Sequence, residues 1–167
     1  MSAAEQAFIT FLRDGCFGPL HANITKEELL QILPELWEAK GATLPPYTLF
    51  SFENFECAFE NDQLLKIKIL FFEKYEQQTW FETFDIRWYD FTRATHLLTM
   101  REFLQQHMIA HSCLFFIDDS VSIQIIGMPI SINFRPGIQN IQNIYRFYVG
   151  MTDWRGSDLV RGVIEFP

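Results

Sequence analysis

Three histidines and a cysteine lie close enough along the chain to raise the question of a metal site. His107 and His111 are four residues apart, with Cys113 just beyond them and His96 upstream. If one helix ran through both histidines, their imidazoles would share a face at the spacing that zinc sites use. However, no Glu adjoins His107, and His111 falls where the helix should end, where a histidine is favoured by the helix dipole alone. We therefore expect no metal ion and no other cofactor.

The carboxylates do not form a recognisable catalytic motif. Asp118 and Asp119 are adjacent between two expected strands, and Asp153 lies alone further on. Adjacent Asp residues in that position are typical of turns. The sequence contains no GxSxG motif and no glycine-rich phosphate loop, which are the usual signs of a nucleophile or a phosphate site. We predict that the protein is not an enzyme; a metal-dependent enzyme built on His107 and His111 is the last alternative.

Aromatic side chains are the strongest sign of a binding surface. The chain has 18 Phe, and aromatic residues make up 16% of it, so some rings should reach the surface of a small sheet protein. Interfaces concentrate Trp and Tyr because each buries a large apolar area and keeps a polar group. For Tyr145 and Phe147, covering the core is an equally open interpretation. The residues that we predict to bind a partner are Trp80, Trp88, Tyr89, Tyr145, Tyr148 and Trp154, with Glu56 and Glu60.

The net charge of the chain indicates which classes of partner it can bind. The 167-residue chain carries a formal net charge of −8, which disfavours nucleic acid and anionic membrane surfaces. The acidity suits a protein with a basic face, because opposite fields speed encounter; an equally open interpretation is that it only maintains solubility. We predict a protein partner, such as a basic toxin, and neither nucleic acid nor membrane.

The cysteines and the first residues of the chain indicate the cellular compartment. Cys16, Cys57 and Cys113 form no CxxC pair and are odd in number, unlike a disulfide framework. Residues 1–7 lack a basic segment and a long apolar stretch, so no signal peptide is visible. No apolar run reaches the length of about 18 residues that a spanning helix needs. We expect a cytoplasmic protein.

Two helices are predicted near the start of the chain. Residues 3–14 carry an apolar stripe and end at Gly15, which favours the left-handed conformation that stops a helix. Thr25 and Glu28 form a capping box, in which each side chain accepts a hydrogen bond from the other's backbone N–H. Pro34 ends the helix that follows.

After residue 46 the hydrophobic pattern alternates, which predicts antiparallel strands. A hairpin is expected to place Lys66 and Lys68 opposite Glu56 and Glu60 on an exposed face. Residues 79–91 fit either a helix or a strand, and their aromatic content favours a strand. The other predicted strands cover residues 47–52, 54–60, 64–72, 113–117, 121–126, 128–134, 139–149 and 159–166.

One short sequence pattern occurs twice in the chain. Residues 24–31 resemble residues 98–105, including a Thr-x-x-Glu start at Thr25 and again at Thr99. Residues 55–59 likewise resemble residues 130–134 at nearly the same offset. Recurrence of both a helix start and a strand indicates a duplicated unit.

The repeat sets the predicted architecture, which is an α+β fold. We expect a tandem repeat of a helix plus an antiparallel β-meander, with the helices packed on one face of a curved antiparallel sheet. The second helix would cover residues 99–109. Residues 1–167 would form a single compact domain made of two repeats, at about 1–92 and 93–167.

This order of elements resembles the β-lactamase-inhibitor-protein-like fold, which is related to small outer-membrane lipoproteins of the BamE type. The shared pattern is a helix with a Thr-x-x-Glu start, an alternating strand ending in Phe, a polar turn and a second apolar strand. It spans Thr25 to Phe72 and Thr99 to Val149. The chain lacks a lipobox cysteine and paired cysteines in each repeat, so neither an envelope lipoprotein nor a secreted inhibitor is expected.

What the resemblance implies is a sheet whose helix-free face grips another protein. We therefore expect a non-enzymatic, cytoplasmic protein-binding module, specifically an immunity or inhibitor protein that neutralises a toxin. The alternative is a regulatory scaffold whose sheet holds a small apolar ligand in an enclosed pocket.

Overall fold

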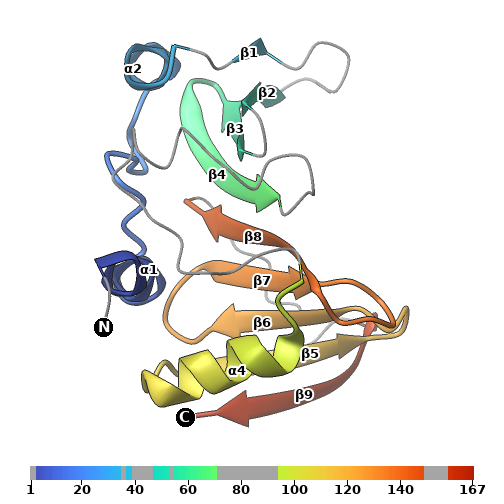
Figure 1. Cartoon of the computed structure of the whole chain (residues 1–167). Coiled ribbons are helices and arrows are strands. Elements are labelled where there is room, and N and C mark those ends of the chain that lie inside the picture. The colour runs from blue at the N-terminus through green and yellow to red at the C-terminus, as the bar shows by residue number, and fades with distance from the viewer. Residues whose placement is uncertain (1–2, 35–36, 39–46, 53–54, 71–93, 149–157) are drawn as a thin grey trace.

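The computed structural model describes residues 3–34, 37–38, 47–52, 55–70, 94–148 and 158–167. Within them, helices lie against one antiparallel sheet (Figure 1), which confirms the predicted α+β class. The predicted strand over residues 79–91 lies outside the described residues. The described helices are α1 (Ala3–Asp14), α2 (Lys26–Ile32) and α4 (Leu97–Gln106).

The described strands form one sheet in the order β1-β2-β3-β4-β8-β7-β6-β5-β9, and all neighbours are antiparallel. Two four-stranded meanders, β1–β4 and β5–β8, therefore meet through their last strands, and β9 lies beside β5. Apart from residues 79–91, the predicted strands lie within two residues of β2 to β9 at either end, and β1 was not predicted. The strands are β1 (Trp37–Glu38), β2 (Tyr47–Phe52), β3 (Phe55–Glu60), β4 (Gln63–Leu70), β5 (His111–Phe116), β6 (Val121–Ile125), β7 (Ile130–Phe134), β8 (Ile141–Phe147) and β9 (Val160–Phe166).

Helix α1 has the predicted bounds, and Gly15 stops it. Gly15 has a φ of 67° and its N–H donates to Phe11 O at 2.9 Å, the geometry of a left-handed helix stop. A second constraint acts on the same residue, because a Cβ there would lie 2.9 Å from Arg146 Nε. Arg146 Nε in turn donates to Gly15 O at 3.2 Å. The end of α1 is thereby fixed to β8.

Helix α2 begins at the predicted capping box. Glu28 N–H donates to Thr25 Oγ1 at 3.2 Å, and Thr25 N–H donates to Glu28 Oε2 at 2.8 Å. The Glu28 carboxylate accepts from the Thr25 backbone N–H and also from the Thr25 hydroxyl at 3.1 Å, and these two hydrogen bonds hold the pKa of the Glu28 carboxyl below its usual value. Two of the helix's first backbone donors are thus satisfied by side chains.

The start of helix α4 corrects the prediction of a second capping box at Thr99. The helix begins at Leu97, and its N-cap is His96, whose Nδ1 accepts from Leu98 N–H at 3.2 Å. Thr99 lies within the helix and is exposed. The physical reason is burial: the helix must include Leu97 for that side chain to join Met100 and later residues on the buried face.

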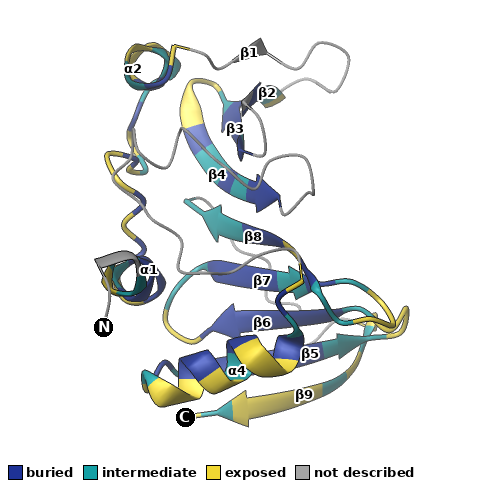
Figure 2. Ribbon diagram, in the orientation of Figure 1, coloured by how far each residue is buried: buried dark blue, intermediate teal, exposed yellow. Residues whose placement is uncertain are grey.

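One hydrophobic cluster lies between the helices and the sheet and runs across both meanders. Phe8 of α1 contacts Phe103 of α4 with ring centroids 5.7 Å apart, and Phe17 stacks on Phe55 of β3 at 6.0 Å. Figure 2 shows how continuous the burial is through β6 and β7. Each fully buried ring contributes about 1.5–3 kcal/mol relative to exposure.

Among the described residues, no helix combines the length and the apolar character that crossing a bilayer requires.

Candidate binding site

The second meander carries opposite chemistry on its two faces. Side chains of one parity, such as Ile123 and Ile132, join the hydrophobic cluster beneath the helices. Side chains of the other parity are polar and lie on the face away from that cluster, and cross-strand pairing aligns them from β6 through β7 to β8. We call this face the polar face; its central residues are Ser122, Gln124, Ser131, Asn133, Asn143 and Tyr145.

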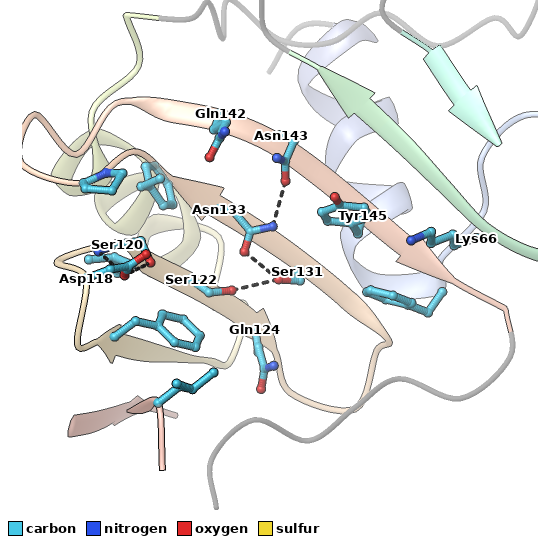
Figure 3. A pocket seen from close by; sticks show the side chains of 16 residues that line it. Lys66, Asp118, Ser120, Ser122, Gln124, Ser131, Asn133, Gln142, Asn143 and Tyr145 are labelled. Carbon is cyan, nitrogen blue, oxygen red and sulfur yellow. Dashed lines mark hydrogen bonds between the residues drawn. The ribbon is translucent and has the colours of Figure 1, made fainter. Parts of the chain in front are cut away.

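A chain of side-chain hydrogen bonds crosses the polar face (Figure 3). Ser131 Oγ donates to Asn133 Oδ1 at 3.1 Å, and Asn133 Nδ2 donates to Asn143 Oδ1 at 2.7 Å. Ser122 Oγ and Ser131 Oγ lie 2.8 Å apart. Because a hydroxyl has one proton, Ser131 must accept from Ser122. The chain therefore runs in one direction and ends at the Asn143 side-chain amide, whose oxygen accepts the last hydrogen bond.

The polar face is hollowed above these residues. A cavity of about 680 Å³ has the hydrogen-bonded chain and Gln124 as its floor. Phe116, Tyr145 and Phe147 are among its lining, and Lys66 and Asp118 stand at its margin (Figure 3). The hollow thus offers amide and hydroxyl groups below, and aromatic rings at the side.

The floor contains an unsatisfied hydrogen-bond donor. Gln124 is 6% exposed, and its Nε2 has no hydrogen-bond partner among the described residues. Leaving such a donor unpaired costs about 1–3 kcal/mol. The Nε2 atom is itself buried, so an acceptor oxygen in the hollow would recover that cost once the Gln124 side chain turned toward it.

Stacked rings and charges continue from the hollow toward the first meander. Tyr145 and Phe147 stack with centroids 5.6 Å apart. The ammonium groups of Lys66 and Lys68 lie 5.4 and 5.5 Å from the centroid of the Tyr145 ring, within the range of a cation–π interaction. Lys68 Nζ also lies 3.4 Å from Glu56 Oε2. The two residues face each other across β3 and β4, as the sequence predicted.

The other predicted partner-binding residues have different positions. Glu60 lies opposite Gln63 and not opposite a lysine. Tyr148 packs against the hydrophobic cluster beside the Arg146 guanidinium, 4.8 Å from its ring, and burial raises its pKa to about 12. Of the predicted residues that the structure describes, Tyr145 and Glu56 are brought together through Lys68, which contacts both. Trp80, Trp88, Tyr89 and Trp154 lie outside the described residues.

The two histidines do not share a helical face. Helix α4 ends at Gln106, so His107 is its C-cap and His111 is the first residue of β5. His107 Nε2 lies 3.1 Å from Glu5 Oε1, which ties α4 to α1. His111 is buried and its Nδ1–H donates to Ile109 O at 2.8 Å. Within the described ranges, no group of three or more His, Cys, Asp or Glu is arranged to hold a metal ion.

The interpretation of Asp118 and Asp119 as turn residues is confirmed. Asp118 Oδ1 accepts from Ser120 N–H at 3.0 Å and from Ser120 Oγ at 2.6 Å, and these bonds lower the pKa of its carboxyl. Asp119 has a φ of 65° and lies 2.6 Å from Arg161 Nη1. The Asp118 carboxylate therefore stabilises the turn between β5 and β6, and the Asp119 carboxylate links that turn to β9.

Sequence reasoning missed Gln124 and the hydrogen-bonded chain. The available signal was the kind of polar residue: β6 and β7 alternate isoleucine with Ser, Gln and Asn, whereas the solvated β3–β4 hairpin alternates with Glu and Lys. Small uncharged side chains on neighbouring strands bond to one another and tolerate burial. Charged side chains at the same positions would stay in water.

Comparison of this chain with family models, curated proteins and solved structures finds no match. The chemistry of the site is therefore the basis for assigning a function.

Proposed function

We propose that this chain is a protein-binding module that grips its partner through the polar face, as an immunity or inhibitor protein that neutralises a toxin. The observation that carries the proposal is the Gln124 amide, which is buried in the floor of an open hollow without a hydrogen-bond partner among the described residues. A partner group with an acceptor oxygen, such as a backbone carbonyl, satisfies it when the Gln124 side chain turns toward the hollow on binding.

The breadth of the surface favours a protein over a small molecule. From the hollow on β6–β8, the polar face continues over Tyr145 to Lys68 on β4 and Glu56 on β3. A small ligand would occupy only the hollow. A protein can place one uncharged loop in the hollow and meet the charged pair and the Tyr145–Phe147 stack around it, as buried anchors with a polar rim do.

The partner's charge is part of the proposal. The chain's net charge of −8 attracts a basic protein over distances comparable to the Debye length, about 8 Å at physiological salt. The margin of the hollow itself carries both signs, with Lys66 on one side and Asp118 on the other. Long-range attraction then speeds encounter, and uncharged contacts in the hollow supply specificity.

The tandem repeat and the inhibitor-like fold are proposals that the topology supports. The two segments that resemble each other in sequence, β3 and β7, are both the third strand of their meander. Each meander follows a helix, and the two join at equivalent last strands, β4 and β8. A cytoplasmic location agrees with three free cysteines.

A second candidate is a ligand-binding module, which the size of the hollow favours. Its volume of about 680 Å³ falls within the range of about 300–1,000 Å³ typical of small-molecule sites. Its aromatic and aliphatic walls suit the apolar part of a ligand, and its polar floor suits an uncharged hydroxyl or carbonyl group on that ligand.

Co-expression tests the proposed function directly. The protein encoded beside this chain's gene is expressed in a bacterial host, alone and with this chain. We expect the neighbouring protein to arrest growth and this chain to restore it, with a stoichiometric complex recovered from the cells. A neighbouring protein that is harmless, or whose toxicity the chain does not relieve, would count against an immunity role. Stabilisation of the chain by neutral sugars or polyols in a thermal-shift panel would then favour the second candidate.

A further inference from the structure

A lysine lies at one end of the hollow on the polar face. Lys66 and Lys68 are almost equally far from the Tyr145 ring, but only Lys68 has a carboxylate beside it, that of Glu56 at 3.4 Å. Lys66 faces Ala58 across β3 and β4, and it forms no ion pair with any described residue. Its half-buried ammonium group can therefore take a carboxylate from outside the chain, in a charge-assisted hydrogen bond, without breaking an existing ion pair.

A carboxylate lies at the other end of the hollow. Asp118 accepts both of its hydrogen bonds from Ser120 through one oxygen, Oδ1, and these bonds hold the carboxylate on the turn between β5 and β6. Asp119 beside it is paired with Arg161, whereas Asp118 forms no ion pair within the described part of the chain. The margin of the hollow thus offers one charge of each sign, at opposite ends (Figure 3).

The strand pairing sets the separation of the two charges. Across the sheet, β8, β7 and β6 lie between Lys66 on β4 and the turn that carries Asp118, so at least three strand spacings, about 14 Å, separate them. Along the strands, Lys66 faces Phe147 at the end of β8, whereas Asp118 lies beyond Val121, which faces Phe134 at the far end of β7. The length of β7, about 16 Å, separates these two levels. The two backbone positions are therefore on the order of 20 Å apart.

This separation decides which kind of occupant can contact both charges. A free amino acid or another small zwitterion carries its charges only a few ångströms apart, so it reaches one end of the hollow and not the other. An extended peptide rises about 3.3 Å per residue, so a segment with about five residues between its charged side chains reaches both. The middle of such a segment lies over the Ser and Asn floor, whose hydroxyl and amide groups match backbone N–H and C=O groups.

We propose that the hollow binds an extended segment of a protein partner, with an acidic side chain at Lys66, an uncharged middle over the floor and a basic side chain at Asp118. This proposal rests on the proposed function, because the segment belongs to a protein. It adds the chemistry of the partner's segment and the orientation of its two charges. The basic end agrees with a partner that is attracted by the chain's net charge of −8.

Peptide selection on the whole chain tests the proposal. A phage-displayed library of random short peptides is panned against the immobilised wild-type protein. We expect the selected peptides to share an acidic and a basic residue about five positions apart. Their binding should weaken as NaCl is added, because salt screens both charge contacts. Failure to select any peptide, or selection of peptides without this pair of charges, would overturn the proposal.

Charge variants assign each end of the segment. Lys66→Met should weaken a selected peptide about tenfold, whereas Lys26→Met, which changes the net charge equally on α2, should not. Asp118→Asn keeps an oxygen that accepts from Ser120. A peptide whose basic residue is replaced by alanine should therefore bind Asp118→Asn and the wild type equally, because the contact is already lost. Equal binding of the parent peptide by Lys66→Met and Lys26→Met would overturn the proposal.

The co-expression experiment fails separately from this one. Growth rescue by the chain, together with selected peptides that lack the pair of charges, would leave the immunity role standing and remove the proposed segment. Selected peptides with the pair of charges, together with no growth rescue, would support the segment and remove the immunity role.

Discussion

At the scale of single residues, a substitution of Gln124 should change the stability of the protein and its binding of a partner in opposite directions. Gln124→Leu removes a buried donor that has no partner among the described residues, so we expect the free energy of unfolding to rise by about 1 kcal/mol while partner binding weakens. Asn143→Leu is the matched control, because it deprives Asn133 Nδ2 of its acceptor at 2.7 Å and should lower stability. Urea denaturation measures both. A Gln124→Leu protein less stable than the wild type would contradict an unsatisfied donor.

His111 should make stability depend on pH near neutrality. Burial lowers the pKa of its imidazole in the folded protein, whereas the unfolded chain titrates at about 6.5. Below that value the unfolded state takes up a proton that the folded state refuses, so the free energy of unfolding falls as the pH decreases. The lowered carboxyl pKa values of Glu28 and Asp118 act only in a more acidic window, below their usual values.

The variant His111→Leu isolates this contribution. It loses the donor to Ile109 O, so its stability at pH 7.5 is lower. The informative quantity is the slope: between about pH 7 and pH 5.5 its urea midpoint should change less than that of the wild type. An equal slope in both proteins would show that another group titrates in that window.

At the scale of elements, the two Thr-x-x-Glu segments have different roles. Thr25→Ala removes a side chain that accepts from Glu28 N–H, and we expect a loss of about 1 kcal/mol of stability. Thr99→Ala is the matched control, because Thr99 is exposed inside α4 and alanine is the better helix former. Thermal and urea denaturation compare the two. Equal losses of stability in the two variants would indicate that Thr99 caps α4.

The contrast between predicted and observed elements has a physical origin. Strand positions followed from alternation, because each strand buries one face. The start of α4 did not follow from its motif, since His96 is an uncommon N-cap and the burial of Leu97 decides the boundary. The chain from Ser122 to Asn143 depends on the register of three strands, which local sequence does not specify. Gln124 could be assigned to a hollow only once the strands were in place.

At the scale of the whole molecule, the seam between β4 and β8 should make the two meanders unfold together. Ile144 is fully buried and lies opposite Ile69 of β4 and Ile132 of β7. Ile144→Ala should lower stability by about 2–5 kcal/mol and keep one cooperative transition. Hydrogen exchange of peptides from β3–β4 and from β6–β7 measures this. Destabilisation confined to one meander would show that they fold independently.

The central proposal is that a protein partner binds the polar face across Tyr145. The net charge, the polar face and the hollow all support it. Isothermal titration of the neighbouring gene's product into wild-type, Tyr145→Ala and Leu98→Ala proteins tests it most directly. Leu98 is exposed on α4, beneath the opposite face of the sheet. We predict a stoichiometric complex that Tyr145→Ala weakens at least about tenfold, which corresponds to about 1.4 kcal/mol, and that Leu98→Ala leaves unchanged. Undiminished binding by Tyr145→Ala together with lost binding by Leu98→Ala would contradict the account and place the partner on the helices.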